Sequence, residues 1–243
     1  FWGFGEGMFF NFVPIRLESE FLLSKQQVGL ALGAFGFFMA ITHIPGGHLA
    51  DRIGRRPLLI IAWVVGMIST LVMGLAKDLP VYLIGLLGYG LTAFVASPLS
   101  SYVTAARGKW EVGTVLSLTS AMFNLGMALG PVTGGWIAER YGMNSSYLVA
   151  FAIFVVSNLC LVSIQSQPID RHDPAAPPQG LLKNTRFVNF LMIYGFVIFA
   201  MYLSQPLTPN FLAGVRDLTL TETGWIFSAG ALGNSVLTLA FSR

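Results

Sequence analysis

The sequence predicts an all-α membrane protein, and three observations lead to this fold class. Apolar residues make up 54% of the 243-residue chain and charged residues only 10%, whereas about a quarter of the residues in soluble domains are charged. The mean hydropathy is +0.69. No charged residue occurs between Asp78 and Arg107, and this stretch is long enough to cross a hydrocarbon core of about 30 Å. The small share of charged residues disfavours a soluble enzyme, because the surface of a soluble protein needs far more charge.

Apolar runs of about 20 residues predict eight membrane segments, of which we expect the first and the last to be cut short. The segments are 1–13, 28–50, 57–76, 79–105, 112–137, 147–164, 187–207 and 224–241. The polar stretch 165–186 carries four prolines and is typical of a linker. We therefore expect a six-helix bundle over 1–164, a cytoplasmic linker over 165–186 and the start of a second bundle over 187–243.

The distribution of Lys and Arg predicts the orientation, because cationic short loops stay on the cytoplasmic side. With the loop after the second segment inside, eight cations are cytoplasmic and five are not. The eight are Arg52, Arg55, Arg56, Arg107, Lys109, Arg171, Lys183 and Arg186; the five are Arg16, Lys25, Lys77, Arg140 and Arg216. The linker then lies in the cytoplasm.

An internal repeat supports two related bundles. Pro14 precedes Gly29 by the same interval that separates Pro209 from Gly224, at an offset of 195 residues (209 minus 14). In both copies an apolar helix ends near a proline, a loop with mixed charge follows, and a Gly-bearing helix begins. Such an offset fits duplicated six-helix halves.

The loop after the second segment carries the most specific motif, running from Gly47 through His48, Leu49 and Ala50 to Asp51 and Arg52, then Gly54, Arg55 and Arg56. Gly54 allows a tight reversal and the arginines hold the loop inside. The string resembles the G-x-L-A-D-R-x-G-R-K-x-x-L signature of major facilitator superfamily transporters, with Arg56 in the Lys place. A positive-inside turn alone would not require the spaced Gly, Leu and Asp.

The resemblance implies twelve membrane helices in two bundles, of which this chain holds eight. It also implies that the loop is a conformational latch whose contacts between the bundles break during transport. The residues concerned are Gly47, Asp51, Arg52, Gly54, Arg55 and Arg56. Their usual partner on the eleventh helix lies beyond this chain.

A second motif lies in the fifth segment. Gly126, Gly130 and Gly134 recur every four residues and form a smooth ridge, and Pro131 removes a backbone donor. We expect a close-packing face, with Gly224 and its small neighbours on the eighth segment as one surface that the ridge contacts. With Gly135 the stretch resembles the signature of proton-coupled antiporters, including drug exporters. The fourth segment departs from that pattern, since Ile84 stands where drug exporters carry an Arg.

Candidate site residues are few. Glu6 is the only acidic residue well inside an apolar segment, and because charge at membrane depth is costly it is our candidate for proton coupling. The alternative is that Glu6 lies near the membrane–water interface, where it would have no role in coupling. Polar groups on several helices form the candidate pathway lining: Asn11, Asn124, Tyr202, Gln205 and Asn234. Each is equally compatible with an interhelical hydrogen bond.

The residues predict no covalent chemistry. We find no nucleophile with a neighbouring base, no metal-ligand cluster and no phosphate-cradling Gly loop with a Lys, so we expect no enzyme activity, metal or cofactor. The charge pattern does not suit nucleic acid. We expect a monomeric plasma-membrane protein that exports a small organic solute in exchange for protons. A symporter or facilitator of sugars, nutrients or metabolites is the alternative, and a non-transporting receptor or scaffold of the same fold is the second alternative.

Overall fold

The computed structural model describes residues 1–167, 183–203 and 205–240, apart from the side chains of Ile44, Gly47 and Asp51. Every regular element in these residues is a helix, which confirms the all-α prediction. The α-helices are α1 (Trp2–Phe9), α2 (Val13–Ser19), α3 (Lys25–Ile53), α4 (Arg55–Leu75), α5 (Leu79–Leu91), α6 (Ala96–Ala106), α7 (Val112–Tyr141), α8 (Met143–Val162), α9 (Thr185–Tyr202), α10 (Thr208–Gly214) and α11 (Leu220–Ala240). Short 3-10 helices are η1 (Phe10–Phe12), η2 (Thr92–Val95) and η4 (Gln205–Leu207).

Six helical stretches of the described residues are long and apolar enough to cross a membrane. They are Lys25–Ala50, Arg55–Leu75, Leu79–Ala106, Val112–Tyr141, Met143–Val162 and Thr185–Gly214. The remaining two predicted segments, 1–13 and 224–241, are also helical in their described residues, in α1–η1 and in α11, which ends at Ala240. Of the predicted linker 165–186, residues 168–182 lie outside the described residues, so the domain boundaries stay a prediction.

The span Leu79–Ala106 changes to a 3-10 turn at η2 because of Pro98. A proline has no N–H, so the carbonyl four residues earlier, that of Phe94, loses its helical donor. Gly46 of α3 packs directly on this carbonyl: a Cβ atom on Gly46 would lie 2.2 Å from the oxygen. Only glycine permits this approach between α3 and η2.

The internal repeat is confirmed residue by residue. Adding 195 to the bounds of η1 gives η4, and adding it to α2 gives α10. The start of α3 at Lys25 corresponds to that of α11 at Leu220. Even the backbone exceptions coincide, since Leu22 and Asp217 have φ values of 56° and 55°.

The turn chemistry explains why both copies fold alike. Ser24 and Gln27 form a reciprocal capping box at the start of α3, and Thr219 and Glu222 bond in the same way at α11, with distances of 3.2 and 2.9 Å. A proline occupies one of the first two positions of both α2 and α10. These local signals fix where each helix begins.

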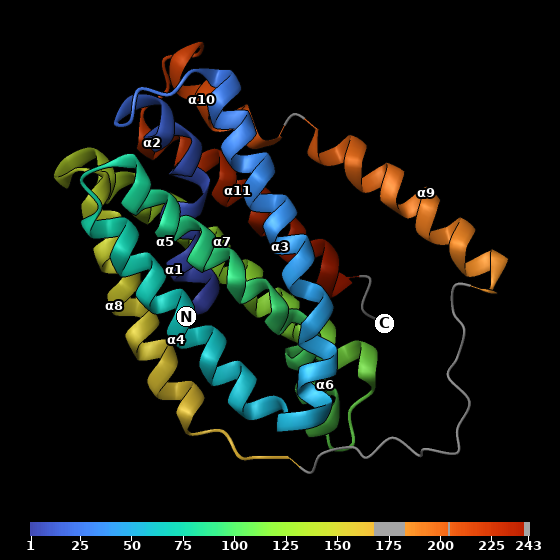
Figure 1. Ribbon diagram of the computed structural model, residues 1–243. Coiled ribbons are helices and arrows are strands. Elements are labelled where there is room, and N and C mark those ends of the chain that lie inside the picture. The colour runs from blue at the N-terminus through green and yellow to red at the C-terminus, as the bar shows by residue number, and fades with distance from the viewer. Residues whose placement is uncertain (168–182, 204, 241–243) are drawn as a thin grey trace.

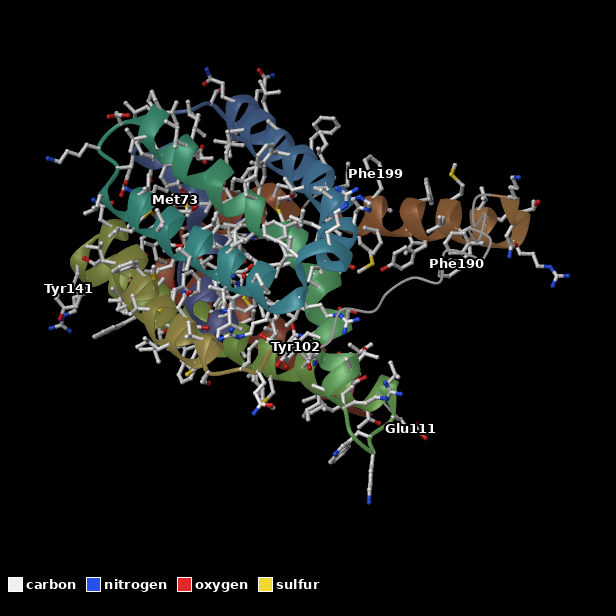
Figure 2. The ribbon with its side chains drawn as sticks, turned by 60° about the horizontal axis from the view of Figure 1, so that its bottom comes forward. Met73, Tyr102, Glu111, Tyr141, Phe190 and Phe199 are labelled. Carbon is white, nitrogen blue, oxygen red and sulfur yellow. The ribbon has the colours of Figure 1, made fainter. Side chains whose placement is uncertain are left out.

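The two copies of the repeat differ in how closely their helices pack on the rest of the protein (Figure 1). α1 lies inside the bundle against α7 and α8, and α11 lies along α7. No residue of α9 is buried, and Figure 2 shows its Phe190 away from the rest of the helices. The aromatic core therefore belongs to the first bundle, with Phe9, Tyr82 and Phe154 fully buried.

Candidate functional site

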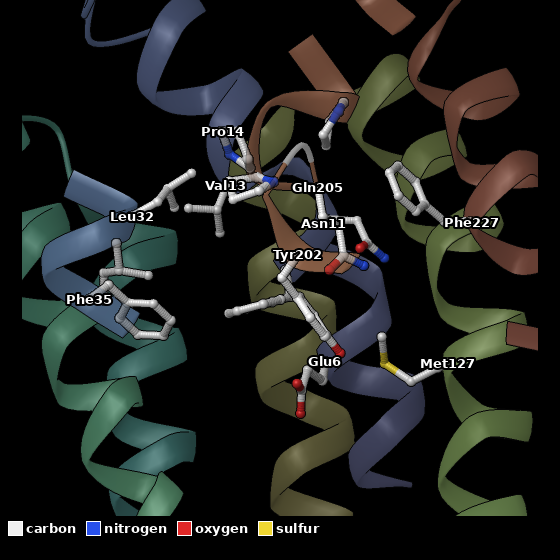
Figure 3. Close-up of a pocket in the computed structure, with 14 residues that line it drawn as sticks. Glu6, Asn11, Val13, Pro14, Leu32, Phe35, Met127, Tyr202, Gln205 and Phe227 are labelled. Carbon is white, nitrogen blue, oxygen red and sulfur yellow. The ribbon is translucent and has the colours of Figure 1, made fainter. Parts of the chain in front are cut away.

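A cavity of about 340 Å³ lies between the two copies of the repeat (Figure 3). Its polar lining comprises Glu6 and Asn11 from the first copy and Tyr202 and Gln205 from the second. Its apolar lining comprises Phe10, Val13, Pro14, Leu32, Phe35, Leu86, Met127, Pro206, Pro209 and Phe227. The site is thus mostly apolar with a few convergent polar groups, which is typical of small-molecule pockets.

The repeat itself builds the cavity. Four pairs of lining residues are related by the 195-residue offset: Phe10 with Gln205, Asn11 with Pro206, Pro14 with Pro209, and Leu32 with Phe227. The cavity therefore lies where equivalent surfaces of the two copies face each other. Glu6 has no acidic counterpart, since its equivalent is Met201, and the negative charge of the lining comes from one side.

Glu6 lies in the middle of α1, is half-buried and lines the cavity at its lower end in Figure 3. Its Oε2 accepts a hydrogen bond of 2.9 Å from Trp2 Nε1, one helical turn away. The buried hydroxyl of Tyr89 on α5 interacts electrostatically with the Glu6 carboxylate but makes no hydrogen bond of normal geometry. A small movement would allow Tyr89 to donate to Glu6.

Aromatic packing holds the Trp2 ring, whose Nε1 donates to Glu6, in a fixed position. Its ring stacks on Phe154 at a centroid distance of 4.3 Å and contacts Trp63 at 4.7 Å. Trp63 is held in turn by a 3.0 Å hydrogen bond to Ser157. Sequence reasoning missed Trp2 and Tyr89; the available signals were the spacing of Trp2 to Glu6 and the two glycines that flank Tyr89.

The structure brings together three of the five predicted pathway residues. Asn11, Tyr202 and Gln205 line the cavity with Glu6. Asn124 and Asn234 are not in its lining; Asn234 Nδ2 donates to Asn124 Oδ1 over 3.1 Å, between α11 and α7. Asn124 and Asn234 therefore form an interhelical hydrogen bond, which was the alternative to lining the pathway that the sequence left open. Ile84 is 67% exposed on the outside of α5.

The glycine ridge of α7 packs on α1 and not on α11, which corrects the expected partner. Cβ atoms on Gly126, Gly130 and Gly134 would lie 2.5, 2.6 and 2.0 Å from backbone atoms of α1. Glycines also line the opposite side, because a Cβ on Gly3 would lie 2.3 Å from the Phe123 carbonyl oxygen. The two backbones therefore touch, and this contact holds the Glu6-bearing helix at the cavity.

The other face of α7 meets α11. A Cβ on Gly135 would lie 2.3 Å from the Leu220 carbonyl oxygen, and one on Gly224 would lie 2.4 Å from that of Pro131. Val132 N donates to Ser228 Oγ over 3.3 Å. α7 continues through Pro131 without a break, so this helix contacts both copies of the repeat.

The loop between α3 and α4 reverses at Gly54, where the sequence predicts a tight reversal, and the φ of Gly54 is 88°, a positive value that favours glycine. Arg55 Nη1 donates to Gln167 Oε1 over 3.1 Å, and Arg56 Nη2 donates to the Val162 carbonyl over 2.8 Å. Val162 is the last residue of α8, and Gln167 lies in the stretch that follows it. Arg52 is exposed, whereas the Gly47 and Asp51 side chains lie outside the described set, so the latch stays a prediction.

Arg16 is a structural residue that the sequence did not single out. We predicted it outside the membrane on the non-cytoplasmic side, yet its side chain is 1% exposed. Its guanidinium donates to Glu20 over 2.8 Å, to the Met73 carbonyl over 3.0 Å and to Asn144. It also lies 4.8 and 4.7 Å from the ring centroids of Tyr82 and Tyr147. It thereby joins α2 to the end of α4 and to α5 and α8.

Comparison with known proteins identifies the family to which the chain is similar. The family model of the Major Facilitator Superfamily matches residues 1–243. The multi-drug resistance efflux pump PmrA of Streptococcus pneumoniae serotype 4 is 26% identical over 238 residues, covering 93% of this chain and 58% of the pump. The multidrug resistance protein MdtG of Proteus mirabilis is 27% identical over 248 residues, covering 96% of this chain and 60% of that protein.

A solved structure shares the fold. The crystal structure of the nucleoside transporter NupG, a D323A mutant, has a TM-score of 0.68 with 12% sequence identity, covering 98% of this chain and 62% of NupG. At this identity the likeness concerns the fold alone. The chain spans about three fifths of the length of the curated relatives it matches.

Proposed function

Because this chain belongs to the major facilitator superfamily, we propose that it is part of a secondary active transporter of the plasma membrane. In this proposal the protein exports a small organic solute by alternating access, in exchange for protons. The cavity between the two repeat copies is the solute site. The observation that carries the proposal is Glu6, the only acidic residue of the cavity lining.

The chemistry of the lining supports an organic cation as the solute. A carboxylate inside an apolar wall attracts one positive charge, and the aromatic rings of Phe10, Phe35, Tyr202 and Phe227 add area and cation–π contacts. The names of the multidrug relatives agree with a broad organic substrate class. An apolar wall that makes few directional bonds accepts solutes of varied shape.

Competition at Glu6 supplies the coupling. The carboxylate binds either a proton or the cationic solute, and each displaces the other. Trp2 and Tyr89 stabilise the ionised form by donating to it, the first in the observed geometry and the second after a small movement. An unpaired carboxylate at membrane depth is costly, so the empty carrier retains the proton until solute arrives.

The test compares Glu6→Gln with the control Glu111→Gln in the complete protein. Glu111 precedes α7 in an exposed loop and makes no capping hydrogen bond. Proteoliposomes with an imposed pH gradient are given ethidium, a fluorescent organic cation. We expect Glu6→Gln to abolish gradient-driven ethidium flux at unchanged membrane abundance, and Glu111→Gln to keep it. Full coupled flux in Glu6→Gln would remove Glu6 from the mechanism.

The same assay separates the alternatives. A facilitative carrier of sugars, nutrients or metabolites would move its solute without the pH gradient, and Glu6→Gln would leave that flux intact. A receptor or scaffold would pass no solute in either condition. Solutes that shift thermal stability without crossing the liposome would favour that last role.

A further inference from the structure

A second, polar cavity of about 500 Å³ opens at the end of the bundle that the charge distribution assigns to the cytoplasm. It lies between the start of α4 and α6, at the lower end of the helices in Figure 1. Two arginines and four hydroxyl-bearing residues line it: Arg55, Ser97, Ser100, Ser101, Thr104 and Arg107. Its only other lining residue among those that the structure describes is Ala105, so none of these described lining residues carries a carboxylate.

The hydroxyl groups form one face of α6. Ser97, Ser101 and Thr104 are spaced three or four residues apart, which places them in a row on a helix. The Ser100 hydroxyl bonds back to the Ala96 carbonyl over 2.9 Å. Hydroxyl groups that face lipid find no hydrogen-bond partner there. This row of hydroxyls instead lies beside the two arginines of the cavity.

The guanidinium groups come from different elements and are both anchored. Arg55 is the first residue of α4, fixed by the reversal at Gly54, and Gln167 accepts from its Nη1. Arg107 follows α6, and its Nη1 donates to the Thr104 carbonyl over 2.8 Å. No carboxylate of the described residues pairs with Arg107. A guanidinium has five N–H donors, so Arg107 retains donors for a ligand.

We propose that this cavity binds the phosphate group of a ligand at the cytoplasmic membrane surface. A phosphate carries several acceptor oxygens and a negative charge, which two arginines recognise with fork geometry and hydroxyls complete. Basic pockets between membrane helices on the cytoplasmic side bind phospholipid headgroups. The phosphate belongs either to such a headgroup or to a soluble molecule, and in both cases the same arginines and hydroxyls would contact it.

The experiment measures binding to the complete protein in detergent micelles at fixed ionic strength. Thermal unfolding is followed while dioleoylphosphatidylglycerol, dioleoylphosphatidylcholine or inorganic phosphate is titrated. We expect saturable stabilisation by phosphatidylglycerol, by inorganic phosphate or by both, and a weaker effect of zwitterionic phosphatidylcholine. Stabilisation by the lipid without competition from phosphate assigns the headgroup, and competition by phosphate assigns the soluble ion. Stabilisation by neither overturns the proposal.

Variants distinguish a built site from general surface charge. Arg107→Gln should weaken apparent affinity at least about tenfold, equivalent to about 1.4 kcal/mol. The control Lys109→Gln removes a nearby exposed cation that does not line the cavity and should change affinity less than about twofold. Equal losses in the two variants would overturn the proposal.

A charge-neutral variant gives a second, independent test. The double substitution Ser101→Ala and Thr104→Ala keeps both arginines and removes two cavity hydroxyls, so we expect a loss of at least about threefold. Unchanged affinity would contradict the assigned contacts. All three variants should unfold at the wild-type temperature without ligand, since none of the exchanged groups is fully buried.

Discussion

The two copies of the repeat, 1–45 and 196–240, share the bounds of their short helices, the starts of α3 and α11, the capping boxes and one turn conformation, but differ in the side chains that pack. α1 carries Gly3 and Gly7 where the second copy has Ile198 and Tyr202. Consequently α1 touches the backbone of α7, while α9 buries no residue. The comparison shows that turn chemistry sets the path of the chain, whereas side-chain size decides which helix enters the bundle.

The charged groups differ in the same way. Glu6 and Arg16 occupy the first copy, and their equivalents are Met201 and Phe211. The first copy therefore contributes the charge of the cavity and the buried cation that joins α4, α5 and α8. Substitutions in each copy test which of these differences matter, and the expected effects decrease through the following four tests.

The largest effect is expected for Gly3→Ile, which gives α1 the side chain of its counterpart. The new Cβ would lie 2.3 Å from the Phe123 carbonyl oxygen, so α1 and α7 must separate. We expect a loss of more than about 3 kcal/mol of stability, measured as thermal unfolding in detergent. The converse Ile198→Gly should cost about 1 kcal/mol, the helical penalty of glycine. Similar melting temperatures would contradict the close contact.

Next is Arg16→Ala compared with Phe211→Ala. Removing Arg16 breaks charge-assisted hydrogen bonds to Glu20, Met73 and Asn144 in a buried site, and we expect a loss of about 3 kcal/mol. Phe211 is 47% exposed, so its truncation should cost about 1 kcal/mol. Arg16→Lys should fall between them, because an ammonium lacks the planar fork. Equal losses at the two positions would show that Arg16 is not structural.

A smaller effect is expected at Asn210, which links the copies. Its side chain donates to the Pro14 carbonyl over 3.0 Å and to Glu18. Asn210→Ala should cost about 1–2 kcal/mol and speed hydrogen exchange in α10, measured by mass spectrometry. Asn189→Ala, an exposed change on α9, is the control. Unchanged exchange in α10 would mean that other contacts dock this helix.

The smallest effects concern the capping boxes, where the copies are alike. Ser24→Ala and Thr219→Ala should each cost about 1 kcal/mol, because each leaves a helical N–H without its acceptor. Chemical denaturation of the helical circular dichroism signal measures both. Losses that differ by more than about 1 kcal/mol would show that the surrounding packing, and not the cap, determines these helix starts.

Several functional features were readable in the sequence for local reasons. The cost of a charge in an apolar run marked Glu6 as a site residue, and in the structure it lines the cavity. The reversal at Gly54 followed from the motif. Asn124 could not be separated from Asn11 in this way, because an amide in an apolar helix gives the same signal whether it faces a cavity or a neighbouring helix.

The partners of particular side chains required the structure. The glycine ridge of α7 predicted a close contact but not its partner, and α1 provides it because Gly3 and Gly7 match the ridge. Arg16 looked like an ordinary loop cation, since nothing near it in the sequence shows that the end of α4 and two tyrosines surround it. Tyr89 carried no charge to attract attention, although it lies beside Glu6.

The sequence by itself determined the helical membrane class, the segment positions and the repeat, because hydropathy, proline positions and capping residues act within a few neighbours along the chain. The tertiary structure alone decided which helix carries the site, which polar groups meet in the cavity and which arginine is buried. Those outcomes depend on contacts between residues far apart in sequence, where the shapes of whole helices must fit together.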